Sequence, residues 1–176
     1  KGYSSLHMAA ESGNLNITRS LMDNGADPTL SNQDKMTPLC VAVYHDNMAV
    51  ISLLVNVYQV NINSFSKEGI TPLHIAIIFK TAEFVEELLN FYEVDINQID
   101  YKGRSPIELA AQYHRSSIIE LLLEREAEIN HIYDYKVLEE IQDAQGESYH
   151  NKIIISLMGE NTTDAGPYEG AILQFF

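Results

Sequence analysis

The chain has 176 residues, of which 45% are hydrophobic, and a formal net charge of −14 at pH 7. No apolar run reaches the ~20 residues that a membrane-spanning helix needs, and an acidic surface repels phosphate backbones, so we expect neither membrane insertion nor direct binding to nucleic acid. The single cysteine, Cys40, excludes an internal disulfide and favours a reducing compartment, so we expect a cytoplasmic protein.

Four segments share a pattern that is typical of the start of a helix. It is clearest at 69–76, where Thr71 can cap the free backbone amides and Pro72 occupies the first helical position. Versions of the pattern recur at 2–9, 35–42 and 103–110. The anchoring apolar residues are Leu6, Leu39, Leu73 and Ile107, at intervals of 33, 34 and 34 residues. This spacing predicts repeated units of nearly constant length.

Each unit is expected to contain two helices. The first repeat, 1–32, has helices over 5–12 and 15–23, with Ile17, Leu21 and Met22 on the buried side of the second helix. The second repeat, 33–65, has helices over 38–45 and 48–57. The third, 66–99, has helices over 72–79 and 82–91, and the fourth, 100–132, has helices over 106–113 and 116–124. The segments 56–63 and 90–97 have closely similar sequences, lack the glycine that commonly ends a helix and hold one extra residue.

The pattern degrades after Asn130. Residues 133–158 predict a degenerate capping repeat with helices over 136–144 and 151–158, since terminal repeats are often atypical. Residues 159–176 predict an irregular tail, whose apolar end at 171–176 either docks on the repeats or begins another domain. Because the chain begins inside a repeat, we also expect residues that precede Lys1.

A period of 33–34 residues with this helix-start pattern resembles the ankyrin repeat. The resemblance implies an all-α solenoid of stacked helix pairs with projecting β-hairpin loops. It further implies that the chain binds another protein through its concave side, without a cofactor and without chemistry of its own. The sequence departs from the family pattern where Lys35 and Asp46 occupy the usual glycines and Cys40 occupies the usual histidine.

The resemblance also indicates which residues face the concave side. Large apolar and aromatic groups at these positions form a stripe with a polar rim, which is the composition of a recognition surface. From the hairpin tips, the candidate partner-binding residues are Tyr3, Met36, Lys67, Glu68, Ile70, Tyr101, Lys102 and Arg104. From the first helices, they are Tyr44, His45, Ile78, Phe79, Gln112 and Tyr113. The alternative is that longer helices or the apolar tail cover the stripe.

No catalytic or metal-binding pattern is found in the sequence. His7 and His74 occupy a motif position whose side chain is expected to bond backbone between neighbouring hairpins. The other histidines show no ligand spacing with each other or with Cys40, and there is neither a phosphate-binding loop nor a nucleophile elbow. We therefore expect a protein that is not an enzyme and holds no metal.

Three alternatives remain open. The chain could be the targeting or substrate-recognition domain of a larger enzyme, toxin or pathogen effector, which would place it in a host cytosol. It could be the substrate of an asparaginyl hydroxylase at Asn97 and Asn130, which follow the hydroxylation pattern of ankyrin proteins but also suit a role in bracing the loops. Finally, residues 81–176 hold nineteen acids and six basic residues, so a basic partner could contact this half.

Overall fold

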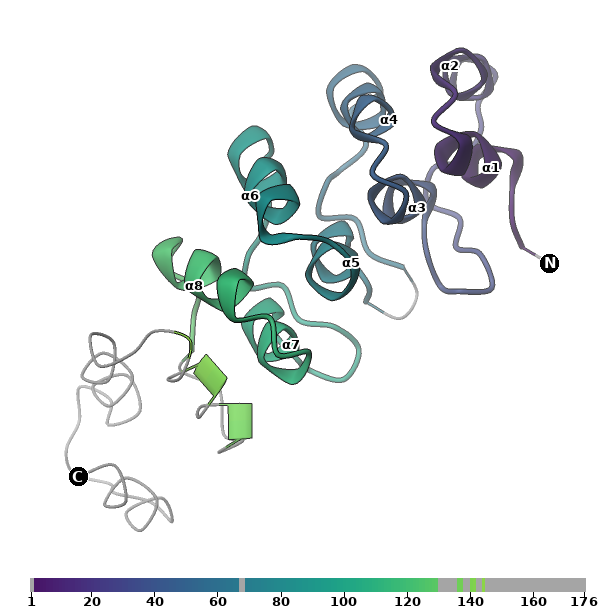
Figure 1. Ribbon diagram of the computed structural model, residues 1–176. Helices are drawn as coiled ribbons and strands as arrows, with labels where there is room; N and C mark the ends of the chain where they lie inside the picture. The colour runs from purple at the N-terminus through teal and green to yellow at the C-terminus, as the bar shows by residue number, and fades with distance from the viewer. Residues whose placement is uncertain (1, 67–68, 130–135, 138–139, 142–143, 145–176) are drawn as a thin grey trace, which may run out of the picture.

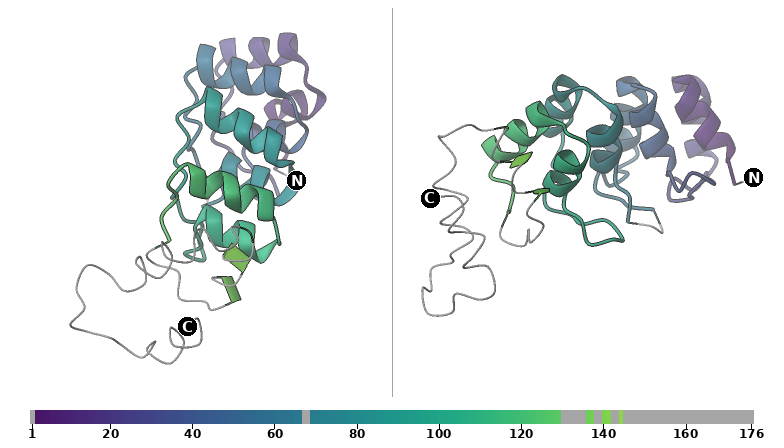
Figure 2. Two further views of the ribbon diagram at one scale, coloured as in Figure 1. Left: turned by 60° about the vertical axis from the view of Figure 1, so that its left-hand side comes forward. Right: turned by 60° about the horizontal axis from the view of Figure 1, so that its bottom comes forward.

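The computed structural model describes residues 2–66, 69–129, 136–137, 140–141 and 144. Its helices form pairs that stack side by side into a curved array, with one row of first helices and one row of second helices (Figures 1 and 2). The first helices are α1 (Ser5–Ser12), α3 (Pro38–Tyr44), α5 (Pro72–Phe79) and α7 (Pro106–Gln112). The second helices are α2 (Leu15–Asp23), α4 (Met48–Ser52) continued by the π-helix η1 (Leu53–Val57), α6 (Ala82–Phe91) and α8 (Ser116–Glu124). The all-α solenoid expected from the sequence is confirmed.

The first helices begin as the sequence predicts. Ser4, Thr37, Thr71 and Ser105 are the N-caps, and the side chain of each accepts a hydrogen bond from the backbone N–H three residues later. Three of the four starts carry proline at the first helical position. In α1, α5 and α7 the third helical residue also bonds back to the N-cap N–H, so these starts are complete capping boxes.

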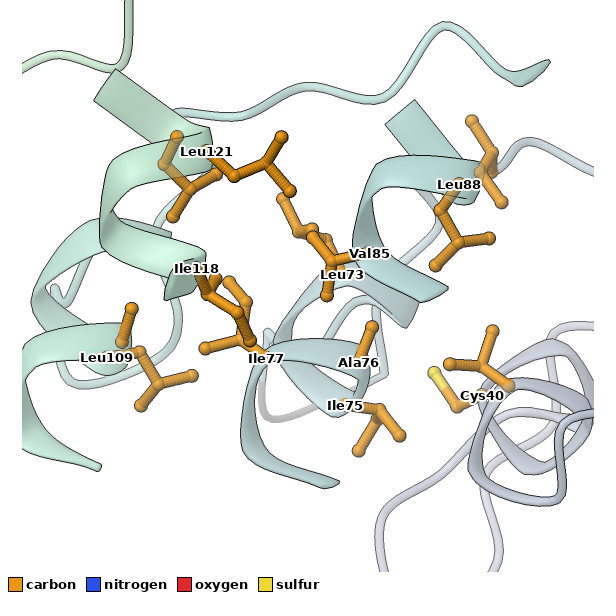
Figure 3. Close-up of a cluster of buried hydrophobic side chains, with 14 of the residues drawn as sticks. Cys40, Leu73, Ile75, Ala76, Ile77, Val85, Leu88, Leu109, Ile118 and Leu121 are labelled. Carbon is orange, nitrogen blue, oxygen red and sulfur yellow. The ribbon is translucent and has the colours of Figure 1, made fainter. Parts of the chain in front are cut away.

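The four anchoring residues occupy equivalent sites. Each is the second residue of its first helix and is no more than 2% exposed. Leu39, Leu73 and Ile107 belong to one hydrophobic core that extends across the repeats, and Figure 3 shows part of it. Each helix pair therefore buries its apolar side against its neighbours, which is how repeat proteins achieve stability without a central core.

The three loops that join consecutive repeats share the same hydrogen bonds among their described residues. In each, the backbone N–H of one residue donates to the carbonyl of the residue four positions later, and the side chain of the first residue accepts from the N–H of the second. The three pairs are Asn32–Met36, Ser66–Ile70 and Asp100–Arg104. The residues with positive φ in these loops are Lys35, Gly69 and Gly103, at 64°, 71° and 77°. The loops are hairpin turns, and none of the described residues lies in a β-strand.

One expectation from the sequence was wrong in detail. Ile17 is 50% exposed rather than buried, and Thr18 is the buried residue of α2. The similar segments 56–63 and 90–97 also differ in structure. The first begins within the π-helix η1 and places Gln59 at a φ of 56°, whereas α6 remains α-helical to Phe91 and ends in extended backbone at Tyr92. The wider π-turn accommodates the extra residue within the helix.

The expected capping repeat lies mostly outside the described residues. Residues 136, 137, 140, 141 and 144 are helical, and Ile141 is buried in the common core. The helix expected over 151–158 and the tail over 159–176 lie outside the described part of the chain. Within the described part, no helix has the length and apolar character required to cross a membrane.

Candidate protein-binding groove

An open cavity of about 560 Å³ lies between the hairpin tips and the ends of the first helices α3 and α5. Seven of the predicted partner-binding residues line it, namely Met36, Tyr44, Ile70, Ile78, Phe79, Tyr101 and Arg104. Asp34, Lys35 and Ile75 complete the lining. We call this cavity and its rim the groove. The structure thus brings together, from three successive repeats, side chains that are up to 70 residues apart in sequence.

Two aromatic rings in the lining of the groove contact each other. Tyr44 and Phe79 are the last residues of α3 and α5, and their ring centroids lie 4.9 Å apart at an interplanar angle of 81°, an edge-to-face contact. They stay 38% and 53% exposed. The Lys80 ammonium lies 5.5 Å from the Tyr44 ring centroid and donates to Asp46 Oδ2 at 2.8 Å. Rings this exposed and this well supported offer a rigid apolar surface to a partner.

The rim of the groove carries Tyr101, which is 56% exposed. The ammonium groups of Lys35 and Lys102 lie 5.8 Å and 5.5 Å from the centroid of its ring, within cation–π range. Tyr101 therefore connects hairpin tips that belong to different repeats. Lys35 was not among the predicted partner-binding residues, because sequence alone marks it only as a replacement for glycine.

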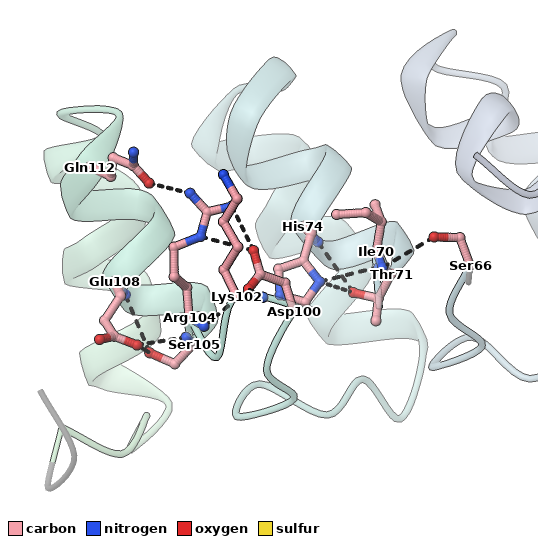
Figure 4. Close-up of polar contacts among 10 residues, drawn as sticks. All are labelled: Ser66, Ile70, Thr71, His74, Asp100, Lys102, Arg104, Ser105, Glu108 and Gln112. Carbon is pink, nitrogen blue, oxygen red and sulfur yellow. Dashed lines mark hydrogen bonds and ion pairs between the residues drawn. The ribbon is translucent and has the colours of Figure 1, made fainter. Parts of the chain in front are cut away.

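Arg104 forms a fixed wall of the groove. Its Nε and Nη2 donate to Asp100 Oδ2 at 2.9 Å and 2.6 Å, and its Nη1 donates to Gln112 Oε1 (Figure 4). Burial raises the pKa of the Asp100 carboxyl, but the bonds from Arg104 and from the Lys102 N–H outweigh it and hold this pKa below its usual value. The carboxylate of Asp100 is therefore ionised at neutral pH and keeps both the hairpin and the Arg104 guanidinium in place.

Side chains from neighbouring repeats secure the ends of the first helices. Arg115, just before α8, donates from Nη1 to Ile78 O at 3.1 Å and from Nη2 to Lys80 O. Asn47, just before α4, donates from Nδ2 to Ala10 O at 2.6 Å and Glu11 O at 2.9 Å. These bonds satisfy carbonyls that a helix end leaves without intrahelical partners. Arg115 in this way holds the backbone on both sides of Phe79.

Of the other predicted partner-binding residues, those that the structure describes do not line the cavity. Tyr3 donates to Glu11 Oε2 at 2.7 Å, and burial together with Glu11 raises the pKa of Tyr3 to about 12. The Nε2 atom of His45 lies 4.0 Å from Glu11 Oε1. Gln112 and Tyr113 lie at the end of α7, and Gln112 lines a second cavity of about 550 Å³ with His114, whose Nδ1 is 2.6 Å from Glu140 Oε1. Lys67 and Glu68 lie outside the described residues.

His7 and Cys40, which the sequence led us to consider for catalysis or metal binding, are buried between the repeats. His7 Nε2 lies 3.0 Å from Met36 O, while Nδ1 accepts from the Ser4 N–H, so His7 links its helix start to the next hairpin as expected. His74 Nδ1 accepts from the Thr71 N–H, but its buried Nε2 has no hydrogen-bond partner among the described residues, so the expected bond to a neighbouring hairpin is not seen for His74. Cys40 is buried, and burial raises the pKa of its thiol, which disfavours the reactive thiolate. No group of His, Cys, Asp and Glu side chains within the described residues could hold a metal ion.

Asn97 has a bracing role in its loop. Its Oδ1 accepts from the Glu128 N–H at 2.9 Å, and Asn63 makes the matching bond to the Asp95 N–H at 2.8 Å one repeat earlier. Asn130 lies outside the described residues. Hydroxylation of these asparagines stays a prediction from the sequence.

Comparisons with known proteins agree with this architecture. A family model for ankyrin repeats (3 copies) matches residues 6–100 and 58–133. An ankyrin repeat protein of fowlpox virus (strain NVSL) is 36% identical over 50 residues, which are 28% of this chain and 36% of that protein. The chain thus aligns with about a third of the length of this relative. The family model covers most of the sequence, and the structure repeats one capped helix start four times and one loop geometry three times. The chain therefore belongs to the ankyrin repeat family.

Proposed function

We propose that this chain is a protein-binding module whose partner occupies the groove. The observation that carries the proposal is the exposed pair of rings, Tyr44 and Phe79, in the lining of a cavity. Bonds from Arg115 hold the backbone on both sides of Phe79. Exposed aromatic groups on a rigid support commonly supply most of the binding energy of a protein interface. Ankyrin repeats are in general protein–protein interaction modules.

Alanine substitution of Phe79 or Tyr44 tests the proposal. Affinity capture from a cell lysate, followed by titration of the captured partner, should show that either variant weakens binding about tenfold or more, the usual range for a central aromatic anchor. Phe91→Ala is the matched control, because Phe91 is also exposed, at 70%, but lies at the end of the second helix α6. Equal binding by wild type, Phe79→Ala and Phe91→Ala would show that the groove is not the binding site.

Two finer proposals follow from the sequence. In the first, the module directs a larger protein to its target, and sequencing the parent gene on both sides of this segment tests it.

In the second, a basic partner contacts the acidic half of the chain, which is supported by the exposed acids Glu83, Glu86, Glu87, Glu120 and Glu124 on α6 and α8. Binding that weakens as ionic strength rises, and that is lost when these acids are replaced by glutamine, would support the second.

A further inference from the structure

The first repeat exposes apolar side chains at positions that the other repeats bury. Met8 of α1 is 62% exposed and Ile17 of α2 is 50% exposed. Counted from the N-caps, Met8 corresponds to Val41, Ile75 and Leu109, and Ile17 corresponds to Val50, Phe84 and Ile118. Phe84 is partly buried against the core, and the other five are no more than 5% exposed.

The difference follows from stacking. The second, third and fourth repeats each pack their first helix on the first helix of the repeat before, whereas α1 and α2 lie at one end of the described array (Figure 1). Met8 and Ile17, together with Leu15, which is 41% exposed, form an apolar surface that we call the outer face. A repeat that closes an array turns a polar face to water. An apolar outer face is therefore the property of an internal repeat.

A polar group beside the outer face is also placed to meet a preceding repeat. Asn47 and Arg115 stand directly before α4 and α8 and donate to carbonyls at the end of the preceding first helix. Asn14 holds the equivalent position before α2 and is exposed. Among the described residues, its side chain makes one hydrogen bond, in which Oδ1 accepts from the Ile17 N–H at 3.0 Å. The Nδ2 atom thus stays available as a donor.

The residues before α1 have the geometry of a loop between repeats. Gly2, with a φ of 112°, stands two residues before the N-cap of α1, as Gly69, with a φ of 71°, stands before that of α5. A Cβ at Gly2 would lie 3.7 Å from Gln33 N, and a Cβ at Gly69 would lie 2.8 Å from the equivalent Tyr101 N. Gly2 therefore stacks on the next hairpin as Gly69 does, and the chain enters α1 through the kind of turn that leads from one repeat into the next.

We propose that the outer face is an interaction surface for a further helix pair of the same kind, which the parent polypeptide supplies before Lys1. Met8 and Ile17 pack against that pair as their counterparts pack in the later repeats, and Asn14 Nδ2 donates to the last carbonyls of its first helix. This surface is separate from the groove and does not depend on the proposed function.

A helix pair of the same polypeptide suits the outer face better than a second copy of the chain. Two copies related by a two-fold axis would set one outer face against the other, so Asn14 would not meet the end of a first helix. A copy that stacked head to tail would need the far side of the fourth repeat, where Ile141 is already buried in the core. The turn at Gly2 also places the covalent connection where a preceding repeat requires it.

Methionine oxidation tests the inference. The parent gene should encode an apolar anchor about 33–34 residues before Leu6, and the chain is expressed with and without this upstream repeat. Both proteins are treated with dilute hydrogen peroxide, and peptide mass spectrometry follows each methionine. Met8 should oxidise about fivefold more slowly in the longer protein, because exposure controls this reaction. Met48 of α4 is the internal control and should oxidise at the same rate in both.

A charge placed on the outer face gives a second test. Ile17→Lys should leave the urea midpoint of the shorter protein within experimental error of wild type, because the new ammonium group reaches water. It should lower the midpoint of the longer protein by about 1 M, since the same group would be buried without a partner. Asn16→Lys is the matched control and should shift neither midpoint, because it adds the same charge at a position that is exposed in all four repeats.

The opposite results would overturn the inference. They are an upstream sequence without a repeat, equal oxidation of Met8 in the two proteins, and equal shifts of the two midpoints by Ile17→Lys. Light scattering covers the remaining alternative. If the shorter protein were a dimer that Ile17→Lys converts to a monomer, the outer face would join two copies, and the assignment to a preceding helix pair would be wrong.

Discussion

At the scale of single residues, some positions with a positive φ accept a side chain, whereas others require glycine. Lys35, Asp46, Gln59, His114 and Glu126 all adopt positive φ without being glycine, at a cost of about 1 kcal/mol each. The chain therefore tolerates side chains where the family pattern has glycine, as Lys35 and Asp46 indicated in the sequence. Gly69 is different, because a Cβ at this position would lie 2.8 Å from Tyr101 N and 3.1 Å from Asp100 C. Close backbone approach, as well as φ, requires glycine there.

Gly69→Ala should therefore destabilise the fold more than Gly103→Ala. The two glycines have similar φ angles, 71° and 77°, but a Cβ at Gly103 meets no atom within 4 Å. Gly103→Ala should cost about 1 kcal/mol, the strain of a left-handed residue, and Gly69→Ala about 2–4 kcal/mol, because the overlap with the backbone of the next loop adds to that strain. Urea unfolding followed by circular dichroism measures both.

The comparison is well controlled because both substitutions change the unfolded chain in the same way. Equal losses of stability in the two variants would mean that the loops do not approach each other as closely as described. A Gly69→Ala variant that folds should also move Tyr101, and with it the rim of the groove.

At the scale of helices, the sequence predicted the starts better than the ends. A start depends on local groups, such as the Thr71 hydroxyl and the Pro72 ring, so four starts could be read from the pattern. The ends at 56–63 and 90–97 depend on how the extra residue is accommodated. Tyr58 donates to Asp23 Oδ1 at 2.6 Å in the preceding second helix, and α4 continues into a π-helix, whereas α6 does not. These contacts between repeats are not visible in a single sequence.

A helix end capped from the next repeat gives an element-scale prediction. Asn47 Nδ2 donates to the Ala10 and Glu11 carbonyls at the end of α1, so Asn47→Ala leaves two acceptors without this donor. We expect a loss of about 1–3 kcal/mol in the free energy of unfolding. Asn16→Ala, on the exposed face of α2, is the control and should change stability by no more than about 0.5 kcal/mol. Similar losses in both variants would show that Asn47 does not couple the first two repeats.

At the scale of the whole molecule, the groove was only partly predictable. The stripe of Met36, Tyr44, Ile70 and Phe79 followed from the repeat register, because equivalent positions of a solenoid face the same side. The approach of the Lys35 and Lys102 ammonium groups to the Tyr101 ring could not be predicted from the register. It depends on how side chains from hairpin tips of different repeats are placed relative to each other. The bond from Tyr3 to Glu11, within the first repeat and outside the cavity, was not anticipated either.

The two buried histidines predict how stability of the array depends on pH. Burial lowers the pKa of His7 and His74 below 6.5, and in both rings Nδ1 accepts a backbone N–H, so the folded protein holds them neutral. The unfolded chain binds protons at these histidines below about pH 6.5, while the folded chain does not. Their stabilising contribution is therefore complete above pH 6.5 and falls as the pH drops from 6.5 through the lowered pKa values. The contribution of Asp100, whose pKa is held below 3.8, is lost only at more acidic pH.

Replacing both histidines by glutamine should flatten this dependence. Glutamine suits the third helical position, because it can return the capping-box bond to the N-cap without titrating. The double variant His7→Gln/His74→Gln should be less stable than wild type at pH 7.5, since an amide in place of the His7 imidazole would not reproduce the bond to the Met36 carbonyl. It should nevertheless lose less stability between pH 7.5 and pH 5.5. Urea unfolding at both pH values measures the two differences, and an unchanged pH dependence in the variant would show that these histidines are protonated in the folded state.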